Sequence, residues 1–274
     1  MIRSLAPTRF VVALIASLLG AGAASAATCR DPAGFAKWLG DIRQEAVAQG
    51  IQPRVVDAGL SGITFDDAVM RKDRGQGAFR VPFDQFVKTR VTSGRVSRAR
   101  GQLRQRAELF GRIEQRFGVP GSVVAAIWAM ETDFGAVMGN MSVIRSVATL
   151  AYDCRRTDRF KGELFAALRV LQKGDLSAAE MKGAWAGEIG QTQFMISNYD
   201  KFAVDFDGNG HADLIRSVPD VLASTANYLR GHGWQRGQGY APGQPNFAAI
   251  KEWNKSDNYA RAIALFASKL EGGE

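Results

Sequence analysis

Glu131 is the residue of this sequence best placed to act as an acid. It closes the apolar run VVAAIWAM at 123–130, and on a helix it shares one face with Val124, Ile127 and Phe134. A carboxyl group on such a face is partly withdrawn from water, which disfavours its charged form and raises its pKa. A carboxyl that stays protonated near neutral pH can serve as a general acid. The alternative is a glutamate at a helix end that reaches solvent or a structural arginine.

The other residue types that hydrolytic enzymes commonly use are scarce around Glu131. Asp133 is the nearest carboxylate, but two residues further along a helix it points away, so a pair of glycosidase carboxylates is not indicated locally. The two histidines, His211 and His232, have no setting that suits a serine or cysteine nucleophile. The sequence therefore favours chemistry that one carboxyl group can carry out.

A second motif, DFDGNGHAD at 205–213, matches the first nine positions of an EF-hand loop. Position 12 of that loop is Arg216 in place of the usual glutamate, so we expect the closing carboxylate to come from further along the chain. A structural Ca²⁺ ion at the entry to the following helix is predicted, and a turn that binds no ion is the alternative. The expected ligands are Asp205, Asp207, Asn209, the backbone carbonyl of His211, Asp213 and Asp220.

The elements that must position these residues are predicted to be mostly helices. Apolar residues recur at helical spacing from Phe35 to Ala46, before Gly50. Ser122 is a candidate cap for a helix that runs to about Phe134. Helical segments are also expected at 96–117, 142–152, 160–172, 193–203, 217–230 and 257–270, and a long loop is expected at 231–245. Strand-like alternation is scarce, so we predict one mainly α domain with lobes around a groove.

Residues 1–26 have the layout of a secretory signal peptide. Two arginines precede the apolar run FVVALIASLL at 10–19, and Ala24-Ser25-Ala26 is a small-residue cleavage site. The apolar run is short for a membrane anchor, and the residues before Cys29 lack the aliphatic residue of a lipid-attachment motif. We therefore expect a mature chain of residues 27–274 in the periplasm, with no integral membrane span and no lipid anchor.

The composition is that of a globular protein and excludes a wholly disordered chain, because 46% of residues are hydrophobic and 23% are charged. The formal charge of +8 becomes +6 once two arginines leave with the signal peptide. An exported cationic protein suits an anionic polymer such as a bacterial envelope, and we expect a monomer with no nucleic-acid partner. Export makes a disulfide between Cys29 and Cys154 possible, and two unpaired thiols are the alternative.

Seven motifs follow one another along the mature chain. They are RFGVP at 116–120, AMETDFG at 129–135, ATLAY at 148–152 with the arginine pair at 155–156, GEIGQTQFM at 187–195, the loop at 205–213, ANYL at 226–229 and WNKSDNY at 253–259. In this order they resemble the B-type lytic murein transglycosylases, glycoside hydrolase family 103. The resemblance covers nearly all of the mature chain.

This resemblance implies a lysozyme-like, α-rich catalytic core with flanking helical lobes. It also implies cleavage of the β-1,4 bond between N-acetylmuramic acid and N-acetylglucosamine in peptidoglycan without consumption of water. The muramoyl C6 hydroxyl closes on C1 and leaves a 1,6-anhydro end. Glu131 matches the catalytic glutamate of the family, which protonates the leaving oxygen and then accepts the C6 hydroxyl proton.

The resemblance also suggests which residues contact the substrate. The positions that match are Gln193, Tyr228, Asn254 and Tyr259 at the sugar, and Arg155 and Arg156 beside the groove, where they could meet stem-peptide carboxylates. Structural roles are the alternative for each of them. The chain departs from the family at two places, since Ala184 stands where a serine is frequent and Trp253 where a tyrosine is frequent.

Two other functions stay open from the sequence. A lysozyme-type hydrolase would need a group that orients water opposite Glu131, and the sequence offers no second carboxylate suited to this. A calcium-dependent peptidoglycan-binding protein without activity is the other alternative, and Ala184 is the only residue that supports it.

Overall fold

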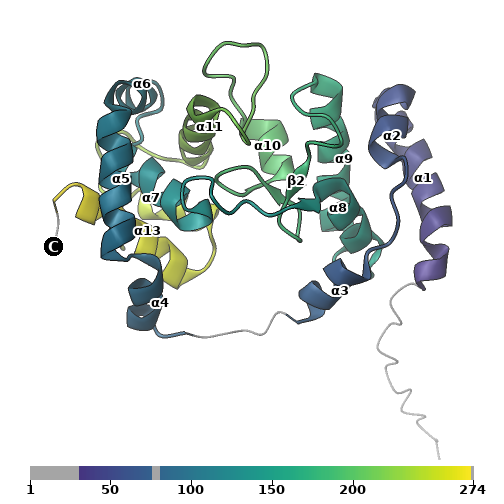
Figure 1. Cartoon of the computed structure of the whole chain (residues 1–274), viewed down its shortest axis with the longest axis horizontal. Coiled ribbons are helices and arrows are strands. Elements are labelled where there is room, and N and C mark those ends of the chain that lie inside the picture. The colour runs from purple at the N-terminus through teal and green to yellow at the C-terminus, as the bar shows by residue number, and fades with distance from the viewer. Residues whose placement is uncertain (1–30, 76–80, 273–274) are drawn as a thin grey trace, which may run out of the picture.

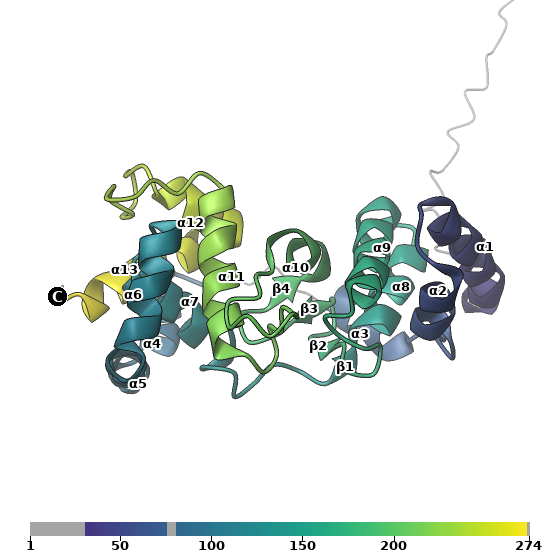
Figure 2. The same ribbon diagram turned by 90° about the horizontal axis from the view of Figure 1, so that it is seen from above.

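The computed structural model describes residues 31–75 and 81–272. Two groups of helices flank a small sheet (Figure 1), and the same arrangement is visible from above (Figure 2). The helices are η1 (Pro32–Gly34), α1 (Phe35–Ala48), α2 (Pro53–Leu60), α3 (Asp67–Arg74), α4 (Phe83–Arg90), α5 (Ser93–Gln105), α6 (Ala107–Phe117), α7 (Gly121–Thr132), α8 (Val143–Tyr152), α9 (Thr157–Lys173), α10 (Ile196–Phe202), α11 (Val218–Gly231), α12 (Phe247–Trp253) and α13 (Asp257–Leu270). The strands are β1 (Met141–Ser142), β2 (Lys182–Gly183), β3 (Glu188–Ile189) and β4 (Phe194–Met195). The prediction of a mainly α fold is confirmed.

The first helical group contains α1, α2, α3, α8 and α9, at the right of Figure 1. The predicted apolar face of α1 is buried from Phe35 to Ala46. Phe35 packs edge-on against Tyr152 of α8, with ring centroids 5.3 Å apart. The Tyr152 hydroxyl donates to the Asp31 carbonyl oxygen, which fixes the start of the described chain against α8.

The second group contains α4 to α7 and α11 to α13, and α7 lies at its centre, packed on α13, α5 and α11. The arginine-rich stretch predicted as one helix is two helices, because the chain bends at Arg106, whose φ of −119° leaves the helical range. The bend lets α5 bury Val96 and Ala99 while α6 turns Phe110 and Ile113 inward. One cluster of buried apolar residues extends through both helical groups.

The prediction for α7 is wrong at both of its ends. The helix begins after Pro120, and the Ser122 hydroxyl donates to Glu271 Oε1 (2.5 Å) instead of capping a backbone N–H group. The helix ends at Thr132, since Asp133 and Phe134 adopt left-handed φ angles of 54° and 66°. Phe134 therefore lies off the helix that carries Glu131.

The sheet connects the two groups and was missed in the sequence, because two-residue strands show no alternation. Its strands are antiparallel in the order β1-β2-β3-β4, and Gly183 pairs with Ile189. Only glycine fits at 183, since a Cβ atom there would lie 2.0 Å from the Glu188 carbonyl oxygen. In the next pairing, Ile189 and Phe194 are buried, whereas Glu188 and Met195 occupy the opposite, more open face.

Several sequence predictions concern residues outside the described ranges. The predicted signal peptide, residues 1–26, and Cys29 both lie there. Cys154 is disulfide-bonded, and its pairing with Cys29 stays a prediction. Within residues 31–75 and 81–272, none of the helices combines the length and apolar character needed to cross a bilayer.

Candidate active site

Glu131 is the one residue of α7 that keeps partial access to solvent. The rest of this helix is surrounded by protein, so its position is fixed, and the left-handed turn at Asp133 directs the chain away directly after the glutamate. Asp133 itself pairs with Arg98 at 2.6 Å and with Arg95 at 3.4 Å. As predicted from the sequence, the two neighbouring carboxylates point to different partners.

The Glu131 carboxyl group is held by donors from two other elements. Trp253 Nε1 donates to Glu131 Oε1 at 2.8 Å, and the Tyr259 hydroxyl is a second hydrogen-bond partner. Burial of the carboxyl group raises the pKa of Glu131 to about 7, because desolvation outweighs these two hydrogen bonds, and the negative charge of Glu188 adds to the increase. A substantial fraction of Glu131 is therefore protonated at neutral pH.

A cleft of about 440 Å³ opens in front of this carboxyl group. It lies between the end of α7, the face of β3 and β4, the middle of α11 and the segment that joins α12 to α13. The lining residues are Glu131, Arg159, Ala184, Trp185, Glu188, Gln193, Phe194, Met195, Asn198, Tyr228, Trp253, Asn254 and Lys255. Three of the residues that the resemblance suggests for substrate contact, Gln193, Tyr228 and Asn254, are thus brought together with Glu131.

Each of these three side chains is anchored by a backbone contact. Gln193 has a left-handed φ of 53° and donates from Nε2 to the Gly190 carbonyl oxygen at 3.0 Å. The Tyr228 hydroxyl donates to the Glu252 carbonyl oxygen at 2.9 Å. Asn254 Oδ1 accepts from the backbone N–H of residue 256 at 3.0 Å. The cleft wall is therefore preorganised, which limits the entropy lost when a ligand binds.

Tyr259 differs from these residues, because it contacts Glu131 and is not among the residues that line the cleft. Burial, together with the adjacent Glu131 carboxylate, raises the pKa of Tyr259 well above its ordinary value. Its hydroxyl group therefore keeps its proton and acts as a fixed donor to Glu131. This geometry favours a positioning role over the predicted contact with sugar.

The arginine pair at 155 and 156 does not line the cleft. Both guanidinium groups bind the carboxylate of Asp73, which is only 2% exposed, and Arg155 Nε also binds Asp153 at 2.9 Å. These ion pairs hold α3 to the segment between α8 and α9. A buried carboxylate orients both arginines, and Arg159 is the arginine that lines the cleft, so a contact of Arg155 and Arg156 with the stem peptide stays a prediction.

Sequence reasoning also missed a second cleft carboxylate. Glu188 lines the cleft with Glu131, although the sequence offered no such candidate. The two residues are far apart along the chain, and a two-residue strand gives no pattern that would have located Glu188. At Ala184, the backbone N–H donates to the Glu188 carbonyl oxygen at 2.8 Å, so this residue keeps a structural hydrogen bond without the serine hydroxyl.

The loop at 205–213 brings acidic groups together as predicted. Carboxylate oxygens of Asp205, Asp207 and Asp220 lie within 4.8 Å of one another. Asp220 is fully buried at the start of α11, where it accepts from the backbone N–H groups of residues 206 (2.7 Å) and 213 (2.9 Å). Desolvation raises the pKa of Asp220, whereas backbone N–H groups lower the pKa of Asp205.

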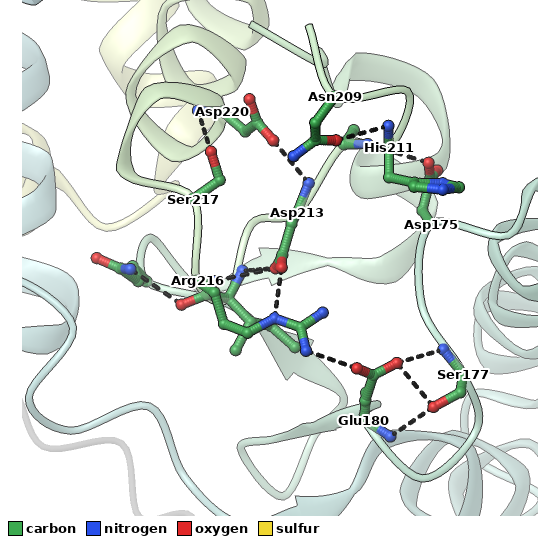
Figure 3. Close-up of polar contacts among 12 residues, drawn as sticks. Asp175, Ser177, Glu180, Asn209, His211, Asp213, Arg216, Ser217 and Asp220 are labelled. Atoms are coloured by element: carbon green, nitrogen blue, oxygen red, sulfur yellow. Dashed lines mark hydrogen bonds and ion pairs between the residues drawn. The ribbon is translucent and has the colours of Figure 1, made fainter. Parts of the chain in front are cut away.

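Two other predicted ligands of this loop have specific partners. Asn209 Oδ1 accepts from the backbone N–H of His211 at 2.9 Å, and the role of the His211 carbonyl stays a prediction. Asp213 turns away from the acidic group, because its carboxylate binds Arg216 Nε at 2.5 Å and the backbone N–H of Arg216 at 3.0 Å (Figure 3). The role of Asp213 as a ligand stays a prediction, and in the structure the arginine at position 12 binds its carboxylate.

Known proteins resemble this chain in both sequence and fold. The membrane-bound lytic murein transglycosylase B of Escherichia coli (strain K12) is 38% identical over 150 residues, and the alignment spans 52% of this chain and 41% of that protein. SltB3 from Pseudomonas aeruginosa, solved with NAG-NAM-pentapeptide and with NAG-anhNAM-pentapeptide, is 34% identical with a TM-score of 0.82. That match covers 87% of this chain and 80% of SltB3.

The lytic transglycosylase Slt35 of Escherichia coli, solved in complex with calcium, is 26% identical to this chain with a TM-score of 0.75. That match covers 85% of this chain and 92% of the Slt35 chain. These likenesses confirm the expected lysozyme-like, mainly α fold. The model of the transglycosylase SLT domain matches residues 34–244, which include Glu131 and most of the cleft. The chain therefore belongs to the transglycosylase SLT domain family.

Proposed function

We propose that this protein is a peptidoglycan lytic transglycosylase in which Glu131 is both the acid and the base. The observation that carries this proposal is a carboxyl group with a pKa of about 7 at the floor of a cleft. A group with this pKa can give and accept a proton at neutral pH with little loss in either direction. Membership of the family and the complexes of SltB3 with NAG-NAM and NAG-anhNAM peptides support the substrate class.

The reaction follows from the two protonation states of Glu131. Protonated Glu131 gives its proton to the glycosidic oxygen as the bond from C1 to that oxygen breaks. The carboxylate that remains is stabilised by the donors Trp253 and Tyr259. It then accepts the proton of the C6 hydroxyl while that oxygen forms its bond to C1. Glu131 is protonated again at the end, no water is consumed, and the product carries a 1,6-anhydro end.

Sugar rings of the glycan strand are proposed to lie along the walls of the cleft. Trp185 and Tyr228 line it, and aromatic side chains combine an apolar face with a polar handle in such sites. The amides of Gln193 and Asn254 supply donors and acceptors for sugar hydroxyl or acetamido groups. This division of roles agrees with the small number of fixed polar groups that usually orient a ligand in a pocket.

We also propose a structural Ca²⁺ site in the loop before α11. The donors fit this ion, because three carboxylates supply hard oxygen atoms within 4.8 Å of one another and Asn209 Oδ1 adds a neutral oxygen. Asp205, Asp207, Asn209 and Asp220 would hold the ion, and the calcium complex of Slt35 supports the proposal. The ion would offset the repulsion of three carboxylates and fix the start of α11, which carries Tyr228.

The location follows from the same substrate. A cell-wall glycan lies outside the cytoplasmic membrane, so we propose export by residues 1–26 to the periplasm, where a disulfide between Cys29 and Cys154 can form. We propose that the mature chain, residues 27–274, acts as a monomeric single domain.

The test is mass spectrometry of the soluble products that the purified mature chain releases from isolated peptidoglycan. We expect anhydro muropeptides from the wild-type protein and from Glu108→Gln, which makes the same chemical change at an exposed glutamate outside the cleft. Glu131→Gln should fold normally and release none. Products that are heavier by one water would show a hydrolase, and active Glu131→Gln would refute the role of Glu131.

A further inference from the structure

Glu188 is an ionisable group in the cleft to which the reaction above gives no role. It lies on β3 opposite Met195 of β4, and both residues line the cleft. Its neighbour Ile189 is fully buried on the other face of the sheet. Because successive residues of a strand point to opposite faces, the burial of Ile189 directs the Glu188 side chain toward the cleft.

Different charged groups surround the two carboxyl groups. Burial raises the pKa of Glu188, and the charge of Glu163 adds to this increase. The backbone N–H groups of residues 186 and 188 and the charge of Arg159 oppose it, because they stabilise the charged form of Glu188. The pKa of Glu131 is raised by the charge of Glu188 on β3 and is lowered only weakly by the charge of Arg90 on α4. An ionised Glu188 therefore favours the protonated form of the acid.

Two carboxyl groups with different environments in one cleft can take different parts in a reaction. Cleavage of a glycosidic bond builds positive charge on C1 and the ring oxygen of the sugar. In the reaction above, Glu131 is neutral before the bond breaks and close to neutral during proton transfer, so it offers little compensation at this stage. An ionised carboxylate in the same cleft supplies a fixed negative charge where water is partly excluded.

Resting on the proposed lytic transglycosylase function, we propose that Glu188 is a further catalytic residue, whose carboxylate stabilises the positive charge that develops at C1 as the glycosidic bond breaks. Glu188 forms no bond and moves no proton in this role. The proton still passes from Glu131 to the leaving oxygen and returns from the C6 hydroxyl. Arg159, which lines the same cleft, then favours the charged form of Glu188.

The experiment compares Glu188→Gln, Glu188→Asp and the control Glu108→Gln, at an exposed glutamate of α6 outside the cleft, with the wild-type chain on soluble glycan strands. We expect Glu188→Gln to lower kcat roughly 10- to 100-fold, less than the loss of a fully enclosed stabilising group because the cleft is open to solvent. KM and the melting temperature should stay unchanged. Glu188→Asp keeps the charge and should recover part of kcat, and the control should match the wild type.

The pH profile separates this role from a purely structural one. Removal of the Glu188 charge removes a repulsion that favours protonated Glu131, so the alkaline limb of kcat/KM should move to lower pH in Glu188→Gln and stay in place in Glu188→Asp. If Glu188→Gln does not fold, the Glu188→Asp variant decides alone. A partial kcat and an alkaline limb of kcat/KM that stays in place in Glu188→Asp support the role. An Asp variant that folds but has no activity overturns it.

The outcomes also distinguish this proposal from the proposed function. Wild-type protein that releases no anhydro product refutes the lytic transglycosylase itself. Wild-type anhydro product with full kcat and an unmoved alkaline limb in Glu188→Gln refutes only the role of Glu188. Hydrated ends that depend on Glu188 would mean that this carboxylate activates water, which overturns the charge-stabilising role.

Discussion

The hydrogen bond from Trp253 to Glu131 should set the upper pH limit of activity. Trp253 Nε1 lies 2.8 Å from Glu131 Oε1, and this N–H group stabilises the carboxylate more than the carboxylic acid. Trp253→Phe keeps an aromatic ring against Phe194 and Tyr228, whose centroids lie 5.3 and 5.0 Å from that of Trp253, but it removes the donor. The pKa of Glu131 should therefore rise from about 7.

The size of the change follows from the difference between two hydrogen bonds. A bond to a charged group contributes about 1.5–3 kcal/mol and a neutral one about 0.5–1.5 kcal/mol, so the charged form loses roughly 1 kcal/mol more. One pKa unit corresponds to about 1.4 kcal/mol, so the pKa should rise by about 0.7 unit. Because Glu131 must be protonated to start the reaction, the alkaline limb of kcat/KM should move to higher pH by the same amount.

The assay is the pH dependence of kcat/KM for the release of soluble products from glycan strands. Trp185→Phe is the matched control, since Trp185 lines the same cleft and is not among the groups that shift the pKa of Glu131. The control should lose some affinity for glycan while its alkaline limb stays in place. A limb in Trp253→Phe that does not move, or that moves to lower pH, would refute this account of how the carboxyl group is tuned.

Two further predictions concern stability. Asp73→Asn should lower the free energy of unfolding by roughly 1–3 kcal/mol in urea titrations, because Arg155 and Arg156 lose a charged partner. Its product pattern should match that of the wild type. A lost product pattern at unchanged stability would contradict the structural role. Calcium at a hundredfold excess over its Kd should raise the melting temperature by roughly 5–10 °C relative to EDTA. This difference should disappear in Asp220→Asn, whereas identical wild-type melting curves with calcium and with EDTA would refute the site.

Local patterns in the sequence were sufficient for the features that depend on neighbouring residues. The desolvation of Glu131 follows from the apolar residues within two turns of it on α7, and the structure confirms the raised pKa. The acidic group at Asp205 and Asp207 follows from the spacing of one loop. The face of α1 from Phe35 to Ala46 is likewise a matter of helical periodicity.

Features that depend on distant segments could not be predicted in this way. The partners of Arg155 and Arg156 lie partly on α3, where the buried carboxylate of Asp73 binds both side chains. Glu188 reaches the cleft through its place on β3 of the sheet, which no local sequence pattern encodes. The orientation of Asp213 is decided by Arg216. For the arginine pair and for Asp213, an ion pair determines which way the charged group points, whereas the placement of a two-residue strand does so for Glu188.

The measurement that tests the central claim most directly is digestion of peptidoglycan in water labelled with heavy oxygen, followed by mass spectrometry of the released muropeptides. If Glu131 carries both proton transfers and the C6 hydroxyl is the nucleophile, the products have anhydro ends without heavy oxygen, and Glu131→Gln gives none. Heavy oxygen at the new sugar end would show that water attacks C1 and would contradict the account.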